Sequence, residues 1–132
     1  MVKRNYIVAS VIIILILISV FIFINQKSKI FDGNIVENDK QFSLDYLFFN
    51  KTITHKMNIK KDMYIGIRII NTVGNIDVVI TDNNNNEIYR GNKISEDSNF
   101  FVKVGDTGEY TINVKGTKAK GSVSFDILEF YN

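Results

Sequence analysis

The chain has 132 residues, enough for one domain of about 100 residues beside a single apolar segment. It contains no cysteine, so disulfides, thiolate metal sites and a lipid-modified N-terminal cysteine are excluded. Lys3 and Arg4 supply the formal charge of +2, because the other 14 basic residues equal the 14 acidic residues in number. A nucleic-acid-binding domain usually carries a basic excess, so this class of function is set aside.

The first predicted element is an apolar helix from Ile7 to Ile24, in which only Ser10 and Ser19 are polar. As an α-helix this segment spans about 27 Å, close to the hydrocarbon thickness of a bilayer. We therefore expect a transmembrane signal anchor over residues 7–24 and a short cytoplasmic N-terminus over residues 1–6. A cleaved signal peptide, which would yield a secreted protein, is the alternative. The apolar run is long for a signal peptide, and no small residues mark a cleavage site behind it.

The residues that flank the apolar helix bear on its orientation. Two basic residues and the α-amino group precede it, and Lys27 and Lys29 follow, a slight bias toward a cytoplasmic N-terminus. Residues 25–34 are expected to form a polar linker, and residues 35–132 an extracytoplasmic β domain. The abundance of Ile, Asn and Lys is typical of an AT-rich bacterial genome, so the expected location is a bacterial cell surface.

Beyond the linker, apolar and polar residues alternate with the period of half-buried strands. Turns rich in Asn, Asp and Gly, which tolerate positive φ angles, separate the alternating runs. Strands are expected at 42–48, 53–59, 63–69, 76–80, 87–90, 100–104, 110–114 and 123–127. The predicted fold class is therefore all-β: an antiparallel Greek-key or jelly-roll sandwich of about eight strands, preceded by one transmembrane helix.

The run from Asp106 to Ile112 resembles the tyrosine corner of immunoglobulin-like and other Greek-key sandwiches. The resemblance implies that Tyr110 points inward and that its hydroxyl bonds to nearby backbone; Ile112 stands where antibody domains have a cysteine. The run 108–114, with the glycine-bounded turn after it and residues 122–125, resembles the last hairpin of exported bacterial jelly-roll modules. Pre-peptidase C-terminal and carbohydrate-binding domains are of this kind. Such sandwiches host many activities, so the resemblance implies a fold and little about function.

The candidate residues for catalysis or metal binding have structural explanations. His55 is the only histidine and has the inward parity of a strand, so we interpret it as a partly buried residue near a sheet edge. Asp82, Asn84 and Asn86 imitate the start of a calcium loop, but Glu87 and Lys93 occupy positions that need Gly and Glu. A hairpin turn is the favoured reading there, and a weak calcium site of another design is the alternative. We expect no enzyme activity, no catalytic residues, no metal and no cofactor.

Four apolar residues are expected to form an interaction patch on an outer face, because they break the parity of the first and last predicted strands. The patch consists of Leu47, Phe49, Leu128 and Phe130. The alternative is that residues 30–36 fold back over these side chains and make a second small core.

The sequence predicts a membrane-tethered, extracytoplasmic β-sandwich module that binds a cell-surface protein or a glycan. The alternatives are an accessory or structural subunit of a membrane protein complex, and a secreted protein after signal cleavage. Glycan platforms usually display aromatic rings on an outer face. Here Tyr64 and Tyr89 have the outward parity and the chain has no tryptophan.

Overall fold

The computed structural model describes residues 2–27 and 30–130. The chain divides into two units, residues 1–30 and residues 31–132. The first unit contains one helix, α1 (Val2–Lys27), of which Lys3–Phe23 is long and apolar enough to cross a membrane, with a mean hydropathy of 3.1. By length and composition, this helix fits a membrane span or a signal sequence.

The second unit is built from seven strands in the described residues, and all their pairings are antiparallel. The strands are β1 (Phe31–Glu37), β2 (Gln41–Phe49), β3 (Thr52–Ile59), β4 (Tyr64–Thr81), β5 (Glu87–Ile94), β6 (Ser98–Lys103) and β7 (Gly108–Leu128). The all-β antiparallel fold that the alternation predicts is confirmed, with seven strands in place of about eight.

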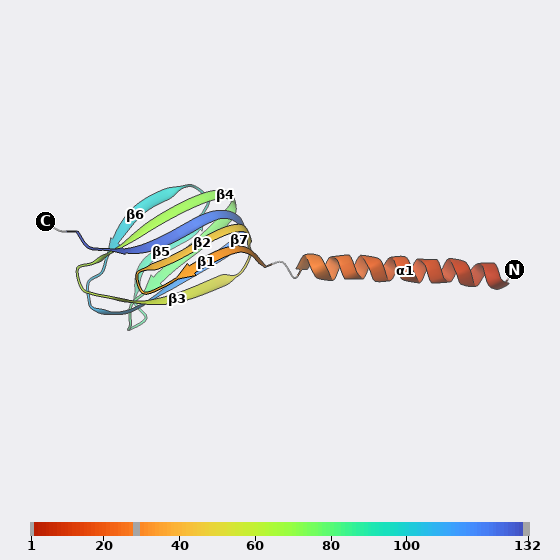
Figure 1. Cartoon of the computed structure of the whole chain (residues 1–132), viewed down its shortest axis with the longest axis horizontal. Coiled ribbons are helices and arrows are strands. Elements are labelled where there is room, and N and C mark those ends of the chain that lie inside the picture. Colours follow the sequence, from red (N-terminus) through yellow and green to blue (C-terminus); the bar gives the residue numbers. More distant parts are fainter. Residues whose placement is uncertain (1, 28–29, 131–132) are drawn as a thin grey trace. The chain divides into compact units, whose positions relative to one another are not determined.

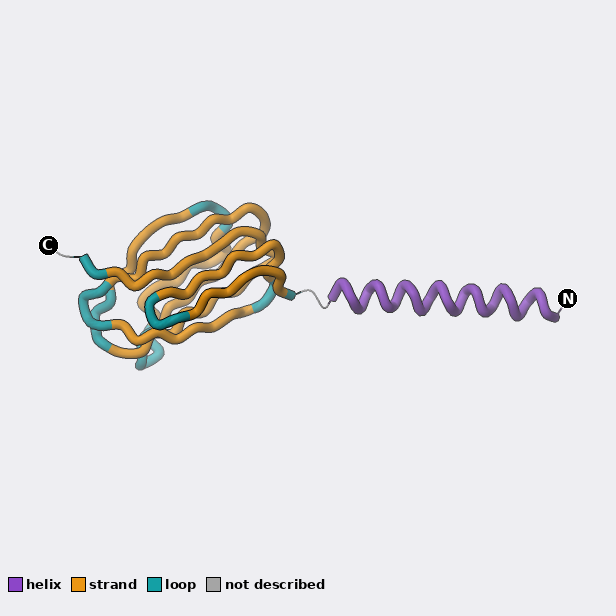
Figure 2. The backbone as a smooth tube through the Cα atoms, viewed as in Figure 1, coloured by secondary structure: helices purple, strands orange, loops and turns teal. Residues whose placement is uncertain are grey.

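The two longest strands, β4 and β7, pair with each other along most of their length and belong to both layers of a sandwich (Figure 1). Their halves at 64–73 and 119–128 lie between β2 and β6, with β1 outside β2, which makes a five-stranded layer. Their other halves, 75–81 and 108–117, lie between β3 and β5, which makes a four-stranded layer. Figure 2 shows the strands of the five-stranded layer side by side in front.

The bends of β4 and β7 lie at two sites where the sequence predicts turns, 73–75 and 116–121. Gly74 and Gly121 have φ angles of 70° and 150°, which L-residues with a Cβ rarely adopt. A Cβ on Gly74 would collide with the backbone of Lys118, and one on Gly121 with the backbone of Ile70. Glycine therefore lets the two strands stay paired while they bend, so two pairs of predicted strands merge into β4 and β7.

The strand count also changes at the start of the domain. The polar segment Asp32-Gly33-Asn34 falls in the expected linker, 25–34, yet belongs to β1, which pairs with β2. Two mergers and one added strand turn the eight expected strands into seven. Residues 28–29 of the expected linker, Met1, and residues 131–132 of the expected domain lie outside the described residues.

The core lies between the two layers and consists of the inward-facing side chains of both. Every fully buried residue in the described part of the chain is apolar or tyrosine. Tyr110 is one of them, and its hydroxyl donates a hydrogen bond to the backbone oxygen of Asp106. The tyrosine-corner geometry expected from the sequence is thus present, and the core offers no buried charge for catalysis.

Candidate binding surface on the five-stranded layer

The outer face of the four-stranded layer is polar, and many of its side chains bond to one another. The Thr54 hydroxyl donates to Oδ1 of Asn113 at 2.6 Å, and Lys56 lies 3.6 Å from the carboxylate of Glu109. The carboxylate of Asp77 accepts the backbone N–H of Lys93 at 2.6 Å. A face whose polar groups already have partners on the same face is typical of a solvated surface, which needs no ligand.

The outer face of the five-stranded layer is different, because small residues line its centre. Ser43 of β2 lies opposite Ser124 of β7, and Gly66 of β4 lies opposite Asp126. A groove of about 620 Å³ lies on this face. It is lined by Asn38, Lys40, Gln41, Gly66, Ile67, Arg68, Asn99, Phe101, Ser124, Asp126, Ile127 and Leu128.

Strand register explains how residues distant in sequence meet in this groove. Gln41, Asp126, Gly66 and Phe101 are direct cross-strand neighbours, so they form one row across β2, β7, β4 and β6. Ser43, Ser124, Arg68 and Asn99 form the next row along the strands. Directly opposed residues in antiparallel strands project on the same face, which makes both rows outward-facing.

Four polar side chains in these two rows lack partners in the protein. Within residues 2–27 and 30–130, no hydrogen bond or ion pair involves the side chain of Gln41, Arg68, Asn99 or Asp126. Arg68 and Asp126 lie in adjacent rows of paired strands, yet they form no ion pair with each other. The groove therefore presents a cation, a carboxylate and two amides that are free to bind another molecule.

Aromatic side chains flank one end of the groove. Phe130 packs edge-on against Tyr64 and Phe101, with ring centroids 4.8 Å and 5.3 Å apart. Phe101 and Phe130 keep 55% and 53% of their surface exposed, although each is a large apolar side chain. The ammonium of Lys103 lies 5.9 Å from the Tyr64 ring. Exposed aromatic rings beside unpartnered polar groups are a common composition of binding surfaces.

The structure separates the four residues of the expected interaction patch. Phe49 is fully buried and packs against Gly116 and the ring of Phe31, whose centroid is 5.6 Å away. An irregularity in register between Tyr46 and Phe49 reverses the parity of β2, which turns Phe49 inward. Phe49 therefore belongs to the main core between the layers, and Phe31, one of residues 30–36, packs against it.

The other three members of the expected patch lie at opposite ends of the layer. Leu47 is 66% exposed and follows Tyr46, which pairs with Gly121. Leu128 lies about 24 Å further along β7, at about 3.4 Å per residue. Leu128 lines the groove and Phe130 stands beside it, so only these two of the four residues belong to the candidate site.

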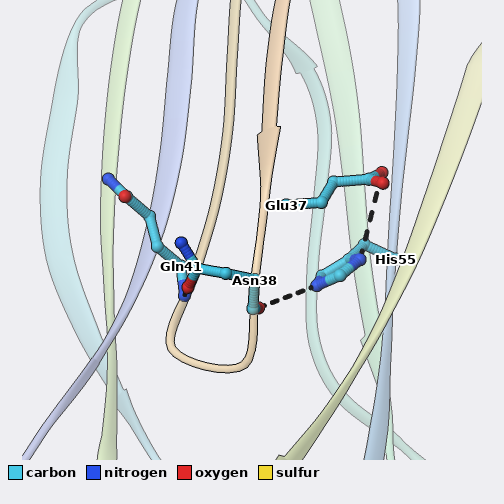
Figure 3. A network of polar contacts seen from close by, with 4 residues as sticks. All are labelled: Glu37, Asn38, Gln41 and His55. Carbon is cyan, nitrogen blue, oxygen red and sulfur yellow. Dashed lines mark hydrogen bonds and ion pairs between the residues drawn. The ribbon is translucent and has the colours of Figure 1, made fainter.

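His55 lies at the open side of the sandwich, where β3 faces the turn between β1 and β2 (Figure 3). Its Nε2 is 3.3 Å from the backbone oxygen of Asn38, and its Nδ1 is 3.9 Å from the carboxylate of Glu37. The ring also packs on Phe42 with centroids 4.9 Å apart. The expected partly buried edge histidine is observed. Figure 3 shows the Gln41 side chain directed away from His55, and Gln41 is one of the residues that line the groove.

Two other candidates from the sequence have structural roles. Oδ1 of Asp82 accepts the backbone N–H groups of Asn84 and Asn86 at 2.9 Å, and these bonds hold the pKa of that carboxyl below its usual value. Among the described residues, no group of three or more acidic or histidine side chains could hold a metal. The outward position expected for Tyr89 is wrong, because its ring packs on Phe100 with centroids 5.0 Å apart and against the core.

The alternation of the sequence predicts that some residues of this groove face outward, but it cannot predict the groove itself. Tyr64 has the outward parity that the sequence predicts, and Gly66 and Arg68 share it along β4. The alternation in 122–128 likewise places Ser124, Asp126 and Leu128 outward. What the sequence lacks is the pairing of β4 with β6 and β7, which brings these positions together.

No family model matches this chain, and no curated protein matches it. Solved structures with a similar fold include an inhibitor of g-type lysozyme from the periplasm of Aeromonas hydrophila, with 14% identity and a TM-score of 0.49 over 72% of this chain and 92% of the inhibitor. The pre-peptidase C-terminal domain of a Bacillus anthracis collagenase has 17% identity and a TM-score of 0.44, over 73% of this chain and 89% of that domain. A CBM61 module in complex with β-1,4-galactotriose has 16% identity and a TM-score of 0.39, over 70% and 66%.

The structures with a similar all-β fold thus include both kinds of domain that the sequence resembles, pre-peptidase C-terminal and carbohydrate-binding domains. One of them is a lysozyme inhibitor, and another was solved in complex with a galactotriose. With TM-scores below 0.5, these similarities carry no argument about ligand or partner, which must be argued from the groove itself.

Proposed function

We propose that the protein is a membrane-tethered, extracytoplasmic binding module that holds a cell-surface glycan in the groove of the five-stranded layer. The observation that carries the proposal is the set of four unpartnered polar side chains that line the groove, Gln41, Arg68, Asn99 and Asp126. The module is proposed to bind its ligand without chemical turnover.

The chemistry of the groove suits a ligand rich in hydroxyl groups. Arg68 offers donors only, an ionised Asp126 offers acceptors only, and the amides of Gln41 and Asn99 offer both. A hydroxyl both donates and accepts, so it can satisfy all four side chains. The exposed ring of Phe101 adds an apolar surface on which the C–H face of a sugar ring can pack. Two cations, Lys40 and Arg68, and one carboxylate, Asp126, line the groove, so it carries charges of both signs.

The aromatic end of the groove and the start of the domain lie at opposite ends of the five-stranded layer. The chain enters the domain at Phe31, which pairs with Phe49 at one end of the five-stranded layer. The aromatic end of the groove lies at the opposite end, where Tyr64 pairs with Leu128 and Lys103. With α1 as a signal anchor and Lys3 and Arg4 in the cytoplasm, the domain stands on the outer side.

Binding to purified bacterial cell-wall glycan tests this proposal. Full-length protein in detergent should sediment with insoluble wall glycan, and both Arg68→Ala and Phe101→Ala should weaken that binding by about tenfold or more, the effect of losing a charged hydrogen bond or a stacked ring.

The chain offers a matched control for each variant. Arg90→Ala removes an exposed arginine from the four-stranded layer, and Leu47→Ala removes an exposed apolar side chain far from the groove. Both controls should bind as the parent protein does. If the parent protein does not bind wall glycan, or if all four variants bind equally, the proposal is wrong. Loss of a co-purifying membrane protein from Phe101→Ala would favour the accessory-subunit alternative instead.

A further inference from the structure

The groove does not stand alone, because two further hollows adjoin it. The first, of about 460 Å³, lies along β4 and β6 and shares Arg68 and Asn99 with the groove. The second, of about 420 Å³, lies at the end of the sandwich and shares Lys40 and Ile127 with the groove. The shared residues place the three hollows next to one another, with the groove in the middle, and we call this series of hollows the path.

We infer that the ligand is a linear polymer that lies along this path with several of its repeating units bound. The path binds an internal stretch of the polymer, and not its end or a small molecule. The inference rests on the proposed function and adds the ligand's length and the direction in which it runs. A site for a chain end has a wall that stops the ligand, whereas this groove shares lining residues with another hollow on each side.

The length of the path supports a polymer. From Ile70 in the first hollow to Tyr64 beside the aromatic end, β4 alone covers about 20 Å, at about 3.3 Å per residue. The path then continues past Lys40 to Lys60 and Lys61 at the end of the sandwich. A single sugar residue would fill only part of the middle groove and would leave the flanking hollows empty.

The spacing of the polar groups also suits a repeating ligand. The row that contains Arg68 and Asn99 and the row that contains Gln41 and Asp126 are two residues apart along the strands, about 7 Å. Each row offers donors and acceptors, so successive units of a polymer would meet similar partners. Such a surface recognises an internal stretch of chain better than a unique terminal group.

The charges along the path define the class of polymer further. Asp97 accompanies Arg68 in the first hollow, and Asp39 and Glu129 accompany the lysines of the last one. A polyanion would meet a carboxylate in every hollow, and such encounters between like charges are unfavourable. The path therefore favours a neutral polymer, or one with balanced charges.

The test uses cell-wall glycan strands that a muramidase has cut and that are then separated by length. Calorimetry on the full-length protein in detergent should give an affinity that rises by about tenfold or more from the disaccharide to the octasaccharide and then levels off. Equal affinity for the disaccharide and the octasaccharide would overturn the inference and leave the proposed function standing. Failure of every length to bind would overturn both.

Variants at the far end of the path provide a second readout. Ile70→Ala removes an exposed side chain from the first hollow, outside the middle groove. It should weaken the octasaccharide several-fold and leave the disaccharide unchanged. Leu47→Ala, which removes an exposed apolar side chain from the same layer but away from the path, should change neither. If Ile70→Ala leaves the octasaccharide unchanged, the ligand does not reach the first hollow and the inference fails.

Discussion

Replacement of Phe49 or Phe130 by alanine tests whether the two residues have different roles. The sequence places both in one patch, whereas the structure places Phe49 in the core and Phe130 on the surface. Phe49 is fully buried, and its ring contacts Phe31, Tyr46 and Gly116. Truncation of a buried phenylalanine costs about 3–5 kcal/mol, because the apolar burial is lost and a cavity remains. A domain of about 100 residues has a free energy of unfolding of about 5–15 kcal/mol, so Phe49→Ala should remove a large part of it.

Phe130→Ala should behave differently, since Phe130 is 53% exposed and follows the last strand. Its loss should change the free energy of unfolding by less than about 1 kcal/mol, the usual range for surface substitutions. Urea denaturation of the full-length protein in detergent, followed by tyrosine fluorescence and by circular dichroism, measures both values. A Phe49→Ala variant as stable as the parent protein would refute the burial of Phe49 and the parity reversal in β2.

Four further predictions concern the tyrosines and the helix. Tyr110→Phe should lower the free energy of unfolding by about 1 kcal/mol, because it removes the bond to Asp106, and an unchanged urea midpoint would contradict the tyrosine corner. Tyr46→Phe should leave stability unchanged or raise it, because the buried Tyr46 hydroxyl has no hydrogen-bond partner among the described residues. Burial raises the pKa of Tyr46 from 10.0 to about 12. Below pH 10 the Tyr46 hydroxyl is protonated in the folded and the unfolded states, so this pKa difference costs no stability there. Between pH 10 and pH 12 the hydroxyl ionises in the unfolded state first, so the free energy of unfolding of the parent protein should fall by up to about 2 kcal/mol, whereas that of Tyr46→Phe should not show this loss. Finally, alkaline extraction should leave the full-length chain in the membrane fraction, whereas a shorter soluble form that begins near Asn25 would indicate a cleaved signal peptide.

Much of the fold follows from the sequence, because burial on one face of a strand imposes a period of two. Phe42, Leu44 and Tyr46 are buried as their alternation predicts, and so are Ile65, Ile67 and Ile69. The first and last predicted strands also pair, as expected for a sandwich of this class. Alternation reports on each strand separately, and it identifies inward residues well wherever the strand is regular.

The failures occur where pairing overrides the local pattern. Gly74 and Gly121 are typical of turns, yet here they permit bends within continuous strands. A turn between two strands and a bend within one strand have the same local composition, so the sequence cannot distinguish them. The irregularity after Tyr46 reverses the parity of Phe49, and such a shift exists only in relation to the partner strand. Asp32-Gly33-Asn34 has the composition of a linker and becomes strand because β2 offers it a free edge.

The candidate site is hardest to predict because it has no motif. Its members are ordinary outward residues such as Arg68, Asn99 and Asp126, each of which alone resembles a solvated side chain. Only the order of β2, β7, β4 and β6 in one layer brings them together, and only the structure shows that they lack partners. Strand order is a long-range property that no local pattern in one sequence contains.

Chemical-shift mapping of the full-length protein in detergent micelles, titrated with soluble cell-wall glycan strands, tests the central claim most directly. The proposed site predicts that the amide resonances of Gly66, Asn99 and Ser124 shift with the ligand, while those of Thr54 and Asn113 on the four-stranded layer stay in place. Shifts confined to the four-stranded layer, or no shifts at all, would contradict a glycan-binding groove on the five-stranded layer.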